Sequence, residues 1–263
     1  MRARRAALAA ALFAWALAAA AQDPAIRLEA LTERIAKLHA QLGQDVLRER
    51  SKRALTETVR QFDAALREAK ARASGAEERD TYVLLGLLWT DYRAWALKPA
   101  TRDHAKKLAE RAEEVAWVAA KGARLKHAGG RGGTGPLALE AAHAAMLSQR
   151  LARLYLLRRW DVKPESAERT APAVESDLER TLERLRAAPA NTPPIETELQ
   201  AAHGQLAFLL KAGRELDSRR PDPRALEFAA KSADHLLESM ERVAGLYGGA
   251  SAPISSAPGS PRP

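Results

Sequence analysis

Residues 141–155, AAHAAMLSQRLARLY, decide the fold, because they combine a helical stripe with a motif that recurs upstream. Leu147, Leu151 and Leu154 are spaced to lie on one face of an α-helix. A weaker copy of the motif, ERIAKLH at residues 33–39, aligns with QRLARLY at residues 149–155, an offset of 116 residues. A period of that length indicates a duplicated structural unit.

The repeat extends beyond this match. Asp45-Val46 and Asp161-Val162 align at the same offset, and residues 112–115 (AEEV) correspond to residues 233–236 (ADHL). Ala, Leu, Arg and Glu dominate the chain, whereas β-branched and aromatic residues are sparse, which favours helix over strand. We therefore expect an all-α protein.

Eight helices are expected from apolar residues spaced three and four apart, four helices in each half. Gly43 ends the first, and Asp222-Pro223 supplies an N-cap and a first-turn proline for the last. The stripes lie at residues 28–42, 55–66, 85–95, 101–119, 147–154, 174–185, 195–209 and 226–247. One stripe on each helix is what a left-handed bundle requires, so we predict two tandem antiparallel four-helix bundles joined by a Gly-rich linker.

The predicted division of the chain follows its composition. Residues 129–135 are rich in glycine without periodicity and indicate a flexible linker, since no strand precedes them and no Lys-Ser/Thr pair follows, as a phosphate-binding loop would require. Residues 249–263 are rich in Ser, Ala, Pro and Gly and are predicted to be a disordered tail. The two bundles are then expected at residues 22–128 and 136–248.

The first 21 residues read as a signal peptide. Residues 1–5 are basic, residues 6–20 are apolar, and Ala19-Ala20-Ala21 offers small residues at a cleavage site. As a helix the apolar run spans roughly 23 Å, short of the ~30 Å hydrocarbon core, so cleavage fits better than a retained anchor. We therefore expect a periplasmic protein that begins near Gln22 and has no stable membrane insertion after cleavage.

Composition also excludes several classes of function. The net charge of +9 is spread over mixed-charge faces, which argues against nucleic-acid binding. The chain has no cysteine, which removes disulfides, thiolate zinc sites and covalently attached haem. Its six histidines are scattered without ligand spacing, and no strand-turn nucleophile is present. We therefore expect no catalytic residues, no metal site and no cofactor, in a protein that is not an enzyme.

Residues 146–155, MLSQRLARLY, resemble the Arg-Met-Leu-Ser-Gln-Arg-(Ile/Met)-Ala-Lys-x-Tyr signature that opens PilJ-type domains. These are the N-terminal sensor domains of type IV pilus methyl-accepting chemotaxis transducers, and nitrate/nitrite sensor kinases share their fold. The first half keeps only RIAKL, at residues 34–38. The resemblance implies four-helix units of about this repeat length and a role in sensing.

One departure from the family pattern bears on the ligand. In the nitrate sensors, an arginine directly before the Met binds the anion at a dimer interface between first helices. Ala145 holds this position here and Glu29 holds it in the first half, and neither can donate a charge-assisted hydrogen bond to an anion. The resemblance therefore does not extend to nitrate binding.

Polar residues beside the motif remain as candidates for contacts with a ligand. The predicted ligand-binding residues are Ser148, Gln149, Arg150 and Arg153, with Arg34 in the first half. The alternative is structural, because arginines at the edge of a core face lay their stems along the bundle and pair with acidic residues of a neighbouring helix.

Two functions remain open from the sequence. The first is an exported, sensor-like binding module without an output domain, which binds a small ligand or a partner such as a membrane receptor and forms a homodimer through its first helices. The second is a structural or scaffolding helical bundle of the periplasm. A ligand module should hold a cavity lined by polar groups, whereas a scaffold should be packed solid with an apolar patch outside.

Overall fold

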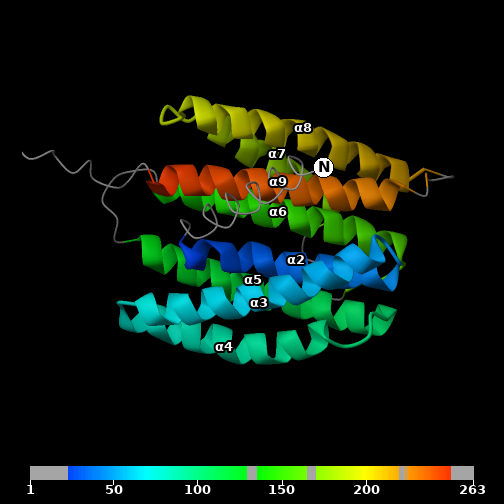
Figure 1. The fold of residues 1–263 in the computed structure, drawn as a ribbon, viewed down its shortest axis with the longest axis horizontal. Helices are drawn as coiled ribbons and strands as arrows, with labels where there is room; N and C mark the ends of the chain where they lie inside the picture. The colour runs from blue at the N-terminus through cyan, green and yellow to red at the C-terminus, as the bar shows by residue number, and fades with distance from the viewer. Residues whose placement is uncertain (1–22, 129–134, 165–169, 219–221, 223, 250–263) are drawn as a thin grey trace, which may run out of the picture.

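The computed structural model describes residues 23–128, 135–164, 170–218, 222 and 224–249, and within these ranges every regular element is an α-helix (Figure 1). The helices are α2 (Pro24–Gly43), α3 (Arg48–Arg72), α4 (Ala76–Ala96), α5 (Arg102–His127), α6 (Gly135–Arg159), α7 (Ala171–Arg186), α8 (Pro193–Leu216) and α9 (Ala225–Gly249). None of these helices is both long and apolar enough to cross a membrane. The all-α prediction is confirmed for the described residues.

Each predicted stripe coincides with one of these helices, although some boundaries differ, as at Thr101, which is the N-cap of α5. The helix α6 begins at Gly135, the last residue of the predicted linker, and α9 begins at Ala225, while Pro223, the predicted first-turn proline, lies outside the described residues. Asp222 Oδ1 accepts a hydrogen bond from Arg224 N at 2.7 Å, so its side chain forms a local turn ahead of the helix. The predicted signal peptide, linker residues 129–134 and tail residues 250–263 lie outside the described residues.

The helices α2 and α6 lie side by side at the centre of the structure (Figure 1). Helix α2 packs against α3 and α5 on one side, and α6 packs against α7 and α9 on the other. The outer helices α4 and α8 lie against α5 and α9. One continuous cluster of buried apolar side chains includes members of all eight helices, so the α2–α6 contact is part of the core.

The turns after α2 and α6 repeat each other. Asp45 and Asp161 both have left-handed backbones, with φ of 56° and 55°, a region that aspartate tolerates better than most residues. The next residue closes the same hydrogen bond in both halves, from Val46 N to Gln41 O and from Val162 N to Leu157 O, each 2.9 Å long. Both valines then join one small apolar cluster. The alignment of the two halves therefore holds at the level of single hydrogen bonds.

Replacing Gly213 of α8 by alanine should destabilise the protein by about 1–2 kcal/mol, although alanine favours helix by about 1 kcal/mol. An added Cβ would lie 2.7 Å from Tyr155 Cε2. The ring cannot easily yield, because Tyr155 is buried and its hydroxyl donates to Glu175 Oε1 at 2.7 Å. Gly204 of the same helix has open space around it, so Gly204→Ala should be stabilising. Thermal unfolding of both variants checks this, and equal shifts would contradict it.

Candidate functional site

The structure brings the five predicted ligand-binding residues to the region where α2 and α6 face each other. Ser148 and Gln149 are 0% exposed, Arg153 is 1% exposed and Arg150 is 7% exposed, while Arg34 is partly buried. Helix α6 can hold so many buried polar side chains because α2, α7 and α9 surround it. Arg150 and Arg153 belong to one cluster of charge and Arg34 to a second, whereas Ser148 and Gln149 belong to neither.

The first, which we call the Glu33 cluster, consists of Glu33, Glu113, Arg150 and Arg153. Glu33 is 0% exposed and accepts from Arg150 Nε at 2.9 Å and from Arg153 Nε at 2.8 Å. Glu113 of α5 completes the cluster, with its oxygens 3.0 Å from Arg150 Nη2 and 2.7 Å from Arg153 Nη2. Two carboxylates therefore balance two guanidinium groups.

The charge balance of this cluster shows in the ionisation of Glu33. Burial alone would raise the pKa of this carboxyl, but the charges and hydrogen bonds of Arg150 and Arg153 outweigh burial and hold it below its usual value. The pKa of Arg150 is raised in turn, because the attraction of Glu33 and Glu113 outweighs the burial of its guanidinium. Glu33, Arg150 and Arg153 therefore remain charged at neutral pH.

The second, which we call the Asp234 cluster, consists of Asp234 of α9, Lys37 and Arg34 of α2, and Arg50 of α3. Lys37 is 0% exposed, and its Nζ lies 2.5 Å from Asp234 Oδ1. Arg34 Nε and Arg50 Nη2 lie 3.9 and 3.8 Å from the same carboxylate. Burial lowers the pKa of Lys37, and the neighbouring arginines lower it further against the opposing pull of Asp234.

The two clusters are related by the internal repeat. Lys37 aligns with Arg153, and Asp234 aligns with Glu113. Lys37 of the first half pairs with Asp234 of the second, and Arg153 of the second half pairs with Glu113 of the first. Such a reciprocal exchange is the pattern of a two-fold symmetric interface, in which the same contact occurs twice. The two halves therefore meet as two subunits of a symmetric dimer would.

Ser148 and Gln149 lie beside the clusters and point toward α9. Ser148 Oγ donates to Ala145 O at 2.7 Å, and Gln149 Nε2 donates to Ala233 O at 2.7 Å. The Oε1 of Gln149 is buried and has no hydrogen-bond partner. Backbone carbonyls therefore hold both of these side chains.

The sequence did not reveal all of the clustered residues. Glu33, Lys37, Glu113, Asp234 and Arg50 were not among the predicted site residues. A signal for most of them was present, because the aligned positions 37 and 153 are both basic and the aligned positions 113 and 234 are both acidic. Like charge kept at aligned positions of two opposing helices points to pairs that cross between the repeats.

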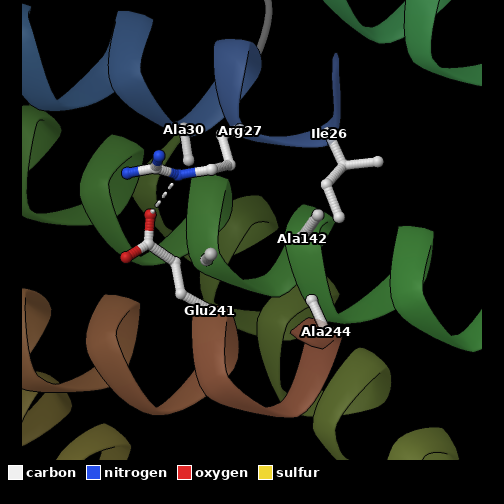
Figure 2. Close-up of a pocket in the computed structure, with 7 residues that line it drawn as sticks. Ile26, Arg27, Ala30, Ala142, Glu241 and Ala244 are labelled. Carbon is white, nitrogen blue, oxygen red and sulfur yellow. Dashed lines mark hydrogen bonds and ion pairs between the residues drawn. The ribbon is translucent and has the colours of Figure 1, made fainter. Parts of the chain in front are cut away.

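A small recess lies between α2, α6 and α9 (Figure 2). Alanines line most of it, including Ala142 and Ala145, and the ion pair between Arg27 Nε and Glu241 Oε1 spans one side at 3.4 Å. It opens to solvent, and the volume inside it that a water-sized molecule can reach is about 10 Å³. A cavity needs roughly 10–15 Å³ of such volume to hold one water molecule, so this recess has no room for a larger ligand.

In the described parts of the chain, no group of three or more His, Asp or Glu side chains is arranged to hold a metal ion. No protein-family model, curated protein or solved structure matches this sequence.

Proposed function

We propose that this chain is an exported, sensor-like binding module built from two tandem four-helix units, and that the contact between α2 and α6 is its ligand-responsive element. In this proposal the two units, joined by the glycine-rich segment, form within one chain the dimer that PilJ-type sensor domains make from two chains. The resemblance of residues 146–155 to those domains supports this reading.

The reciprocal buried ion pairs between the two halves carry the proposal. Burying charges costs several kcal/mol per ion, and apolar residues of similar volume commonly give an equal or more stable protein. Lys37, Arg153 and Glu33 are nevertheless almost wholly excluded from water. We therefore expect buried charges of this kind to have another role, which is either to fix the register of an interface or to respond to a ligand.

A thermal-shift screen of small anions, cations and neutral metabolites tests the proposal on the chain from residue 22 onward. A ligand of the α2–α6 contact should raise the melting temperature of the unmodified protein and have no effect on the double variant Lys37→Met/Asp234→Leu. That variant should stay folded, because it replaces a buried pair by apolar side chains.

The matched control for this screen is Lys231→Met/Glu227→Leu, which removes an exposed ion pair of α9 at 3.1 Å and should leave the ligand response intact. If no compound shifts the unmodified protein, or if every shift survives in the Lys37/Asp234 variant, the α2–α6 contact is not a ligand-responsive element.

A scaffolding function is the second candidate, and an exposed apolar seam between α4 and α5 favours it. Leu84 and Trp117 are 45% and 62% exposed, and Leu87 is 69% exposed. Ion pairs from Glu77 to Lys121 and from Asp91 to Arg111 flank this stretch of the two antiparallel helices. A scaffold that binds a partner through this seam would keep that binding in the Lys37→Met/Asp234→Leu variant.

A further inference from the structure

The two charge clusters occupy aligned positions, of which one differs in charge, and the Asp234 cluster has an additional cation in Arg50 of α3. Arg34 and Lys37 on α2 align with Arg150 and Arg153 on α6, and both clusters include one acidic residue from the last helix of the opposite half. The remaining member differs, because Glu33 of the first half aligns with Gln149 of the second. One carboxylate is therefore replaced by a neutral amide.

The Glu33 cluster is closed by this carboxylate. Glu33 lies between the two guanidinium groups, with Arg150 Nη2 at 2.8 Å from Oε1 and Arg153 Nε at 2.8 Å from Oε2. Together with Glu113 it neutralises both arginines. Nothing in this cluster calls for a further ion.

The Asp234 cluster lacks this balance. Lys37, Arg34 and Arg50 surround a single carboxylate, so positive charges outnumber negative ones by two. Glu57 of α3 also acts on Arg34, but its own hydrogen bonds go to Arg60 and Gln61. The Asp234 carboxylate accepts a hydrogen bond only from Lys37 within the described contacts, because Arg34 and Arg50 lie at 3.8 Å or more.

Two buried polar atoms beside this excess charge have no hydrogen-bond partner. They are the Nε of Arg34, a donor, and the Oε1 of Gln149, an acceptor on a side chain that is 0% exposed. Gln149 directs its amide nitrogen to Ala233 O at 2.7 Å, a contact that a glutamate at this position could not make. Buried polar atoms without partners are uncommon in folded proteins. An anion can accept a hydrogen bond from Arg34 Nε, whereas Gln149 Oε1 is itself an acceptor and needs a separate donor such as a water molecule.

We propose that the Asp234 cluster binds a small monovalent carboxylate, which supplies the negative charge that Glu33 supplies in the aligned cluster. Arg34 Nε, Lys37 and Arg50 would be its cationic partners. This inference rests on the proposed function and assigns the chemical class of the ligand at the same α2–α6 contact.

The local side chains are compatible with such a ligand. Lys37 carries a compact ammonium group where Arg153 carries a planar guanidinium, so the Asp234 cluster needs less room for its own protein groups. The Arg50 side chain is 50% exposed and the Arg34 side chain is 14% exposed, so the cluster reaches solvent on the α3 side. An ion can therefore enter without unfolding of the core.

Formate is the probe for the first test, because it is a carboxylate with almost no further bulk. Saturating formate should raise the melting temperature of the unmodified protein by roughly 5 °C above chloride at the same ionic strength, as expected for a ligand well above its dissociation constant. Equal effects of formate and chloride, or no effect of either, would show that the excess charge is merely screened by salt and would overturn the proposal.

One substitution of an aligned residue tests the same idea from inside the protein. Gln149→Glu supplies the carboxylate covalently and should abolish the response to formate. If Gln149→Glu does not fold, Arg34→Gln, at a partly exposed residue, should also remove the response. A formate response that persists in these Gln149 and Arg34 variants would place the ion elsewhere.

The outcome also separates this inference from the proposed function. A formate-insensitive protein that responds to another compound, with the response lost in Lys37→Met/Asp234→Leu, would reject the carboxylate and leave the α2–α6 contact as the ligand-responsive element. A protein that responds to no compound would reject both.

Discussion

The Glu33→Ala variant is expected to be less stable than the unmodified protein by about 3–5 kcal/mol. Glu33 is 0% exposed and is the carboxylate that lies between Arg150 and Arg153, so its removal leaves two buried guanidinium groups with Glu113 as their remaining partner. Removing one member of a buried charged network costs more than the network contributes, because the other charges stay out of water. Urea unfolding at neutral pH measures the difference.

Two comparisons identify the cause of this loss. Glu227→Ala breaks an exposed pair with Lys231 on α9 and should cost about 0.5 kcal/mol or less. Replacing all four residues of the Glu33 cluster by apolar side chains of similar volume should recover most of the stability lost in Glu33→Ala. A cost below about 1 kcal/mol for Glu33→Ala would mean that Glu113 and solvent suffice to neutralise the arginines.

The helices were predictable because each one has to bury a single stripe of apolar residues. The large apolar residues of α2 and α6, for example Leu31, Ile35, Leu147 and Leu151, repeat at helical spacing and are buried. The turns after both helices were also aligned correctly at Asp45 and Asp161. The spacing of residues along one helix determines these features, so they can be predicted without knowledge of the tertiary arrangement.

The depth of the charged residues could not be predicted in the same way. Arg150 and Arg153 flank the leucine stripe of α6 and were expected at the edge of a core face, yet Arg153 is 1% exposed. Their burial depends on α2, a helix more than a hundred residues upstream, which covers the face that the local pattern leaves open. Contacts of this range depend on how the repeats meet, which the spacing of one helix does not encode.

The contact between first helices illustrates the same limit. From the resemblance, the first helices were expected to form a homodimer. In the structure α2 and α6, the first helices of the two repeats, pack against each other within a single chain. The duplication itself was visible in the sequence, but the pairing of its copies was not, because an alignment of repeats is equally compatible with separate units.

The free energy of unfolding should decrease by about 3 kcal/mol as the pH is lowered from 6.5 to 4, because of His39. Its side chain is 1% exposed, its Nδ1 has no hydrogen-bond partner, and its Nε2 lies 3.3 Å from Lys98 O. Burial lowers the pKa of His39 from 6.5 to about 4. Below pH 6.5 the imidazole of the unfolded chain binds a proton that the folded protein does not bind. Lowering the pH therefore lowers the stability, until the folded state is protonated as well.

The measurement is the free energy of unfolding as a function of pH for the unmodified protein and for His39→Leu. The difference between the two curves should be flat above pH 7 and should change by about 3 kcal/mol on going down to pH 4, in favour of the variant. The buried carboxylates Glu33 and Asp234 have lowered pKa values, so their contribution is present above their ordinary pKa values of 4.5 and 3.8 and is lost as the pH falls further. Both proteins keep these carboxylates, so the loss cancels in the comparison. His203→Leu, at an exposed position of α8, should leave the curve unchanged. If His39→Leu declined as steeply as the unmodified protein, His39 would have to accept its proton in the folded state at an ordinary pH, and the α2–α4 end of the structure would have to open to water to allow it.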